Sequence, residues 1–155
     1  MEISEDELAK FLTAANKSTY ANKDAPKSPS LRPFSEDYHF EHNDLVYHDT
    51  YFGARDFIGE EIVYKASTPI WGMNYYGHVL KADASTKEVY AILRPALMKE
   101  YNDILPVRGP KEFVLGNSKY TNVAEGTLDR FSGEENIYLN NELVYRAWYH
   151  GGSIK

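Results

Sequence analysis

The sequence of 155 residues contains no cysteine. Disulfide bonds, thiol nucleophiles and cysteine-based metal sites are therefore excluded from its chemistry. No apolar run approaches the roughly 20 residues that a membrane-spanning helix needs. The acidic start of the chain also lacks the basic and apolar segments of a signal peptide. These absences predict a cytoplasmic protein without a membrane partner.

Positive charge is also scarce, because 17 Lys and Arg face 23 Asp and Glu, for a net charge of −6. A nucleic-acid binder gains most of its affinity from basic side chains on phosphates. Here the basic residues are scattered, so direct nucleic-acid binding is not expected. The chain has neither a Gly-rich phosphate loop nor a Gly-x-Ser-x-Gly elbow, and its five His form no set of converging metal ligands. We therefore predict no metal, no cofactor and no catalytic residue.

Aromatic residues are abundant instead, at 14% of the chain with 13 Tyr. Tyr joins a flat apolar ring to a polar hydroxyl. A Tyr-rich β-sheet explains this content, and so does an aromatic-lined pocket. The length fits one domain with a real core, which we place at residues 1–155.

One stretch of the chain occurs twice. Residues 57–77 align without a gap with residues 131–151, at an offset of 74 positions, and Phe, Gly, Glu, Glu, Tyr, Tyr and Gly recur. Self-similarity at a fixed offset is information about the fold. Gly59 and Gly133 precede the Glu pair in the two copies, where we expect a β-bulge or a positive φ.

Two helices are predicted from capping boxes and apolar periodicity. Ser4 begins a capping box ahead of a helix over residues 4–16. Ser85 begins another ahead of a helix that reaches about Tyr101. Pro95 should kink or split the second helix, because it lacks an N–H and clashes with the preceding turn.

Alternating segments predict the strands. They span residues 38–42, 45–52, 60–65, 70–76, 120–128, 135–139 and 143–150. Asn tolerates the left-handed conformation of a two-residue hairpin turn, so residues 43–44 and 140–141 are good turns and residues 66–67, Ala-Ser, a poorer one. Residues 17–36 form either a lid or a loose loop.

Each half of the chain therefore consists of a helix, an Arg-Pro-containing loop and about three antiparallel strands. The predicted fold class is α+β. Two pseudo-symmetric helix-plus-three-strand repeats, at approximately residues 4–78 and 85–151, form a curved antiparallel sheet with helices packed on one side.

Side chains alternate between the two faces of a strand. On one face, the last strand of each repeat is apolar or aromatic in both copies, as a core face requires. The opposite face carries Asn74, Tyr76, Trp148 and His150, which differ between the copies. This divergence predicts either an asymmetric ligand site or a solvated sheet surface.

Two carboxylates, Glu61 and Glu135, share the parity of the apolar face and need partners if that face is buried. Arg108 is one of four Arg that could supply them. Adjacent Glu residues in a strand point to opposite faces, so neither Glu-Glu pair is a catalytic dyad. The candidate ligand-binding residues are Tyr51, Glu61, Asn74, Tyr76, Arg108, Glu135, Trp148 and His150.

Five motifs together carry a resemblance. They are Asp-Thr-Tyr-Phe-Gly at 49–53, Phe-Ile-Gly-Glu-Glu at 57–61, Trp-Gly-Met-Asn-Tyr-Tyr-Gly at 71–77, Arg-Gly-Pro at 108–110 and His-Gly-Gly at 150–152. The chain resembles a family of bacterial proteins of unknown function, found alone or fused C-terminally to XRE-type helix-turn-helix regulators. The resemblance implies a role in sensing, by association with transcription regulation, and brings no catalytic residues. This chain has no helix-turn-helix segment.

Three functions compete. The prediction is a small-molecule (effector) binding or sensor module, with an aromatic, acidic cleft between the repeats that favours a cationic or flat ring-bearing ligand. One alternative is a small hydrolase or isomerase that uses Glu and His in the same cleft. The other is a sheet-mediated protein-interaction module, for example a homodimer. An enzyme is the less favoured class.

Overall fold

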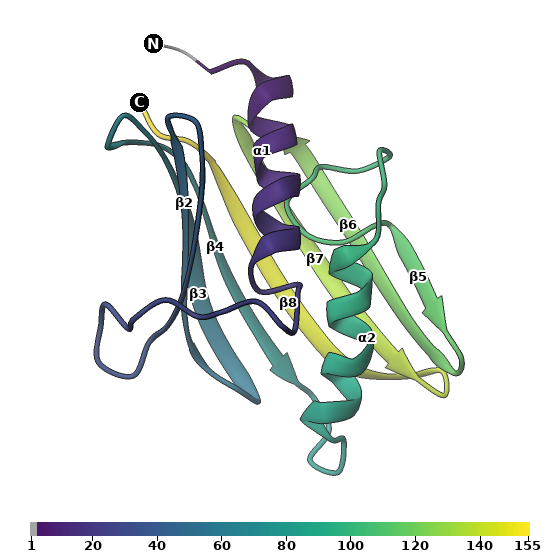
Figure 1. Cartoon of the computed structure of the whole chain (residues 1–155). Coiled ribbons are helices and arrows are strands. Elements are labelled where there is room, and N and C mark those ends of the chain that lie inside the picture. The colour runs from purple at the N-terminus through teal and green to yellow at the C-terminus, as the bar shows by residue number, and fades with distance from the viewer. Residues whose placement is uncertain (1–2) are drawn as a thin grey trace.

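A computed structural model describes residues 3–155 of the chain. It shows one open, eight-stranded antiparallel sheet with two helices against one face (Figure 1). The helices are α1 (Glu5–Ser18) and α2 (Thr86–Met98). The strands are β1 (Glu36–His42), β2 (Leu45–Gly53), β3 (Asp56–Lys65), β4 (Thr68–Val79), β5 (Glu112–Leu115), β6 (Ser118–Thr127), β7 (Arg130–Leu139) and β8 (Glu142–Ser153). The predicted α+β class is confirmed.

The strand order is β1-β2-β3-β4-β8-β7-β6-β5, so β1 and β5 are the edges. Each half of the chain contributes four strands, and the prediction of three is wrong. The strand missed in the second half is β5, a four-residue edge strand that is too short for its alternation to stand out. Within residues 3–155, neither helix has the length and apolar character needed to cross a membrane.

Both helices begin at the predicted serines. The Ser4 side chain accepts a hydrogen bond from the Glu7 N–H, and Ser85 accepts one from the Lys87 N–H. Pro95 does not split α2, because it lies in the last turn, where a missing N–H removes one hydrogen bond and leaves the earlier turns intact. The helix simply ends earlier than predicted.

The β3–β4 and β7–β8 hairpins have the same register at an offset of 74 residues. Phe57 pairs with Gly77, and Phe131 with Gly151. Each hairpin also has a register shift at the same place, after Val63 in one and 74 residues later in the other. The last strands of the two hairpins, β4 and β8, pair with each other at the centre of the sheet.

The turns follow the predicted left-handed geometry. Asn43 has φ 57°, while Asn140 and Asn141 have φ 49° and 65°. The poorer turn adopts the same geometry, because Ala66 and Ser67 have φ 47° and 67°. Ala and Ser lack the local hydrogen bond that makes this region accessible to Asn, so this turn is strained.

The core lies between the helices and the sheet. The face predicted to be apolar is buried throughout: Trp71, Met73, Tyr75, Tyr145, Ala147 and Tyr149. From the helix side, α1 contributes Leu12 and α2 contributes Leu93. Burial of each large side chain stabilises the fold by about 1.5–3 kcal/mol.

The predicted backbone role of Gly59 and Gly133 is wrong. Neither has a positive φ, and the register shifts lie further along their strands. Instead, each glycine makes room for a tyrosine ring on the neighbouring strand. A Cβ at Gly59 would lie 2.4 Å from the Tyr75 hydroxyl, and one at Gly133 would lie 2.2 Å from Cζ of Tyr149.

Candidate ligand-binding site

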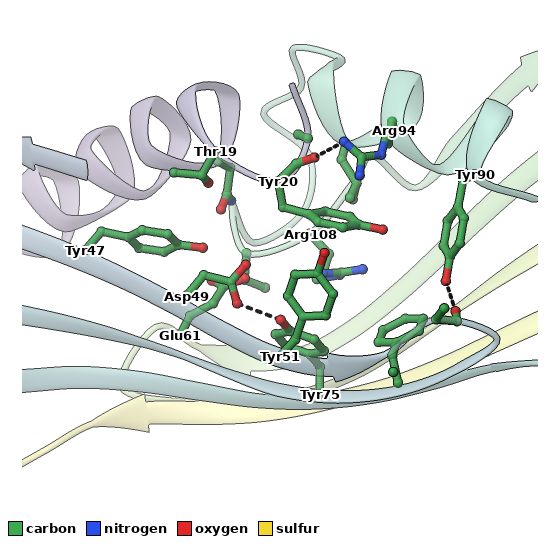
Figure 2. Close-up of a pocket in the computed structure, with 17 residues that line it drawn as sticks. Thr19, Tyr20, Tyr47, Asp49, Tyr51, Glu61, Tyr75, Tyr90, Arg94 and Arg108 are labelled. Carbon is green, nitrogen blue, oxygen red and sulfur yellow. Dashed lines mark hydrogen bonds between the residues drawn. The ribbon is translucent and has the colours of Figure 1, made fainter. Parts of the chain in front are cut away.

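A pocket of about 120 Å³ lies between the helix layer and the first half of the sheet (Figure 2). The end of α1 and the turn after it form one wall, strands β2, β3 and β4 form the floor, and α2 with residues 107–108 closes the other side. The labelled lining residues are Thr19, Tyr20, Tyr47, Asp49, Tyr51, Glu61, Tyr75, Tyr90, Arg94 and Arg108. Five of these ten are tyrosines, so aromatic rings form a large part of the walls.

Two carboxylates lie side by side on the floor. Asp49 of β2 is the cross-strand partner of Glu61 of β3, and such partners on one face have Cβ atoms about 4.5–5.5 Å apart. Both side chains are buried, with exposed fractions of 2% and 4%. The period of two in β2 places Tyr47 and Tyr51 on the same face as Asp49.

The two carboxylates differ in their partners. Oδ1 of Asp49 accepts a hydrogen bond of 2.6 Å from the Tyr75 hydroxyl. Oε2 of Glu61 is buried and has no hydrogen-bond partner among the described residues. An unsatisfied buried polar group costs about 1–3 kcal/mol, so this oxygen is an unusual feature of the pocket.

Burial raises the pKa of both groups. Loss of water raises the pKa of Asp49 to about 7, against the opposing effects of the Tyr75 hydrogen bond and of Arg108. Burial and then the neighbouring Asp49 raise the pKa of Glu61 to about 8. At neutral pH the pair therefore holds protons that it can exchange.

A third buried carboxylate, Glu135, is fully paired. It accepts hydrogen bonds from the Tyr120 hydroxyl at 2.7 Å and the Tyr145 hydroxyl at 2.9 Å. Arg108 donates to both carboxylate oxygens, from Nε at 3.2 Å and also from Nη2. This bidentate, charge-assisted arrangement neutralises Glu135.

Comparison of the two halves of the sheet shows which partners of Glu135 are missing at Glu61. Trp71 stands in the register position that Tyr145 has in β8, and its Nε1 donates to the Leu128 carbonyl at 3.0 Å. Glu61 consequently has neither a tyrosine from β4 nor an arginine. The difference between Trp71 and Tyr145 therefore removes one of the partners that Glu135 has and Glu61 lacks.

The partner across the ladder differs as well. Asn122 faces Glu135, where Asp49 faces Glu61. Tyr149 donates to Asn122 at 2.6 Å, just as Tyr75 donates to Asp49. The second half therefore has an amide where the first has an acid, so the two acidic groups lie together in the pocket.

The structure brings together half of the residues predicted for the site. Tyr51, Glu61 and Arg108 line the pocket, and Glu135 lies next to it through its pairing with Arg108. Glu61 and Arg108 therefore both line the pocket, and their role in ligand binding stays a prediction.

The other four predicted site residues lie on the opposite side of the sheet from the pocket. Asn74, Tyr76, Trp148 and His150 lie on the helix-free face, where Tyr76 is 42% and Trp148 43% exposed. The prediction that these four residues line the pocket is therefore wrong. Side chains alternate along a strand, so these residues point away from the buried face on which the pocket lies. The cavity lies on the core side, where the two helices leave part of the sheet uncovered.

Sequence reasoning missed several pocket residues, including Asp49, Tyr75 and Arg94. The signal for Asp49 was present, since it shares parity with Tyr51 within one motif. Arg94 lies on α2, with its guanidinium 4.5 Å from the centre of the Tyr20 ring. Its place over the first half of the sheet depends on helix packing, which no local pattern reveals.

Histidine does not contribute to the pocket. None of the five His is among the residues that line it. His48 lies 2.9 Å from the Asp37 carboxylate instead. Within residues 3–155, no three His, Asp or Glu side chains converge as metal ligands would.

The fold and the pocket define the class of protein: a small α+β domain with one open antiparallel sheet, two helices and a tyrosine-lined acidic pocket. The chain belongs to the family described as a domain of unknown function, DUF5680, whose model matches residues 49–154, more than half of the chain. Comparison with curated proteins gave no match, and neither did comparison with solved structures. The matched region begins at Asp49 and includes Glu61, Arg108 and Glu135. The bacterial origin and the regulator fusions stay predictions.

Proposed function

We propose that this domain binds a small molecule in the pocket above Asp49 and Glu61, as an effector-binding or sensor module. The observation that carries the proposal is the Glu61 carboxylate, which lines the pocket with one buried oxygen lacking a partner within the described chain. A bound molecule that donates to this oxygen would remove the penalty of leaving it unsatisfied. Perturbed carboxylates in a concave, aromatic site are typical of binding sites.

The size of the pocket limits the ligand. Its volume of about 120 Å³ is close to that of a cavity of about 150 Å³, which admits benzene. The enclosed part of the ligand therefore has about half a dozen non-hydrogen atoms. A larger molecule would extend past Ala54 and Arg94 toward solvent.

We also infer that the site arose by divergence of two pseudo-symmetric units, approximately residues 4–78 and 85–151. The shared register of the two hairpins and the matching Tyr75–Asp49 and Tyr149–Asn122 hydrogen bonds support this view. In this account the second unit keeps a closed polar network for stability. The first unit has the open carboxylate for binding.

A thermal-shift screen against a metabolite library tests the proposal, because a ligand that binds the native state raises its melting temperature. Ala54→Trp should block the pocket, since Ala54 is exposed and lines it. Ala82→Trp is the matched control, because Ala82 is exposed and outside the pocket lining. Ligands should stabilise the parent and the control, and not Ala54→Trp. A library without ligands, or ligands indifferent to Ala54→Trp, would contradict the proposal.

The pKa values give a second candidate function. Groups with pKa values near 7 and 8, as burial gives Asp49 and Glu61, suit general acid–base catalysis at neutral pH. A small hydrolase or isomerase would then use this acid pair without His. Turnover of a ligand from the screen, followed by NMR and lost in Glu61→Gln, would establish it; an unchanged ligand would leave binding as the function.

An exposed apolar row on the helix-free face favours a third candidate, protein interaction through the sheet. Ile58, Tyr76, Trp148 and Val123 are aligned across the strands with Glu134 between the last two, and the four are 56%, 42%, 43% and 66% exposed. Light scattering of the parent and of Trp148→Ser tests for a homodimer. A monomeric parent at high concentration would exclude that form of the interaction.

A further inference from the structure

We propose that the ligand carries a small organic ammonium group, and that Asp49 and Glu61 together receive its positive charge. This inference rests on the proposed binding function and adds the charge and chemical class of the bound group. Four observations support it: the balance of buried charge, the geometry of the unpaired oxygen, the aromatic walls and the proton linkage of the pair.

The first observation is the balance of charge beneath the helices. Arg108 and Glu135 neutralise each other. In residues 3–155, no Lys, Arg or His forms an ion pair with Asp49 or Glu61, which are both buried. When ionised, the pair therefore represents two negative charges without a cation, and a buried charge of this kind requires a partner.

The neighbours on each packing element do not supply that partner. Strand β2 offers the Tyr47 hydroxyl and β4 the Tyr75 hydroxyl, which are neutral. From β1 and β7, Asp37 and Glu135 add negative charge to the field at the pair, and Arg108 opposes it. Arg108 is held by Glu135, so its charge is already shared.

Arg94 lies elsewhere in the pocket. Its Nη1 donates to the Tyr20 carbonyl at 3.0 Å, and its guanidinium stacks over the Tyr20 ring. In Figure 2 it projects from α2 on the side away from Tyr47 and the two acids. Arg94 is thus bound to Tyr20, and Arg108, which also lines the pocket, is bound to Glu135. A positive group fits beside the two acids.

The second and third observations distinguish an organic cation from a metal ion. Glu61 has one buried oxygen without a partner, which suits an N–H donor. Hard metal ions need about six or more oxygen ligands, and the two acids are the carboxylates that line this pocket. The tyrosine walls instead favour an ammonium ion, because the negative faces of aromatic rings attract organic cations.

The fourth observation is the proton linkage. Burial raises the pKa of both acids, so that the free pocket holds protons near neutral pH. An ammonium ion would bind the ionised pair, and the displaced proton would leave to solvent. Binding should therefore strengthen as the pH rises from 6 to 8, by up to about tenfold per pH unit for each proton released. An aliphatic ammonium group with a pKa of about 10 stays charged over this range.

The test uses three probes with four-carbon chains and similar size: n-butylammonium, 1-butanol and butanoate. Each is titrated into the parent by calorimetry at pH 6 and pH 8, with its site located by amide NMR shifts. Glu61→Gln removes the carboxylate. Glu60→Gln is the matched control, because Glu60 is the neighbouring residue on the opposite face, paired with Arg32.

We expect n-butylammonium to bind the parent and Glu60→Gln at least tenfold more tightly at pH 8 than at pH 6, with shifts on β2 and β3. We expect at least a tenfold loss of affinity in Glu61→Gln. If Glu61→Gln does not fold, Asp49→Asn is used in its place, with the same expected loss. Equal binding of 1-butanol, binding unchanged in Glu61→Gln or no binding of n-butylammonium would overturn the ammonium assignment. A neutral or anionic metabolite whose stabilisation is lost in Ala54→Trp would overturn it too, while the binding function itself would stand.

Discussion

Glu61 and Glu135 stand at matching positions of the β3–β4 and β7–β8 hairpins, yet their carboxylates have opposite environments. Arg108 donates from Nε and Nη2 to both oxygens of Glu135, whereas one oxygen of Glu61 has no partner in the described part of the chain. The two residues therefore serve as internal references for each other. Glu135 is a paired carboxylate of the core, and Glu61 is a carboxylate that lines the pocket with one unpaired oxygen.

The first prediction compares the two positions by the same substitution. Glu135→Gln should lower the free energy of unfolding by about 3–5 kcal/mol, because it leaves Arg108 buried without its counter-charge. Glu61→Gln should instead raise the free energy of unfolding at pH 7, because it removes a buried acid that has no ion-pair partner and whose pKa burial raises to about 8. Urea unfolding measures both. Equal losses would show that the carboxylates have the same role.

The second prediction concerns pH. Burial raises the pKa of Asp49 from 3.8 to about 7 and that of Glu61 from 4.5 to about 8. The folded state thus binds these protons more tightly than the unfolded state. The resulting stability is complete below the unfolded values and is lost as the pH rises through the folded values.

The free energy of unfolding should therefore fall between about pH 5 and pH 8, by up to about 1.4 kcal/mol per pH unit for each group. Glu61→Gln should reduce this slope, and Glu60→Gln should preserve it. Denaturant unfolding across this range provides the measurement. A parent whose stability is flat from pH 5 to pH 8 would show that the pair titrates normally.

The third prediction tests the role of glycine beside the site. A Cβ at Gly59 would meet the Tyr75 ring and the Thr50 carbonyl at 2.4–2.7 Å. Gly59→Ala should therefore destabilise the fold by about 1–3 kcal/mol and weaken ligand binding, because Tyr75 must move away from Asp49. Gly133→Ala should destabilise the fold similarly without affecting binding. If Gly59→Ala kept both the melting temperature and the binding of the parent, Tyr75 would not need this space.

The fourth prediction concerns the strained turn after β3. Ala66 and Ser67 occupy the left-handed region with φ of 47° and 67°, which costs a non-glycine residue about 1–2 kcal/mol. Replacing the pair by Asn-Gly, the favoured sequence for this turn, should raise stability by about 1 kcal/mol. Thermal unfolding measures the gain. A lower melting temperature would mean that one of the two original side chains makes a stabilising contact.

Local patterns were sufficient to predict much of the fold. The capping serines, the parity of β4 and β8 and the Asn turns follow from interactions within a few residues or from strict alternation, and the structure has all of them. Strand β5 and the end of α2 were missed because a four-residue edge strand and a proline in a last turn carry weak local signals.

The site was harder to predict, because its position depends on which face of the sheet the helices cover and on where they leave a cavity. Parity correctly separated the face of Glu61 from that of Trp148. The sequence alone could not show that the cavity lies on the Glu61 side, since that depends on how α1 and α2 pack against the sheet. Divergence between the copies at Tyr76 and Trp148 instead suggested the wrong face.

The most direct test of the account is a carbon-13 NMR titration of the Glu61 side-chain carboxyl in the folded protein. Its signal should titrate together with that of Asp49 at apparent pKa values near 7 to 8. Addition of n-butylammonium should move the Glu61 transition to lower pH. A Glu61 carboxyl that is fully ionised below pH 6, or whose transition is unaffected by the probe, would contradict the claim that Glu61 holds a proton in the free pocket and releases it when a cation binds.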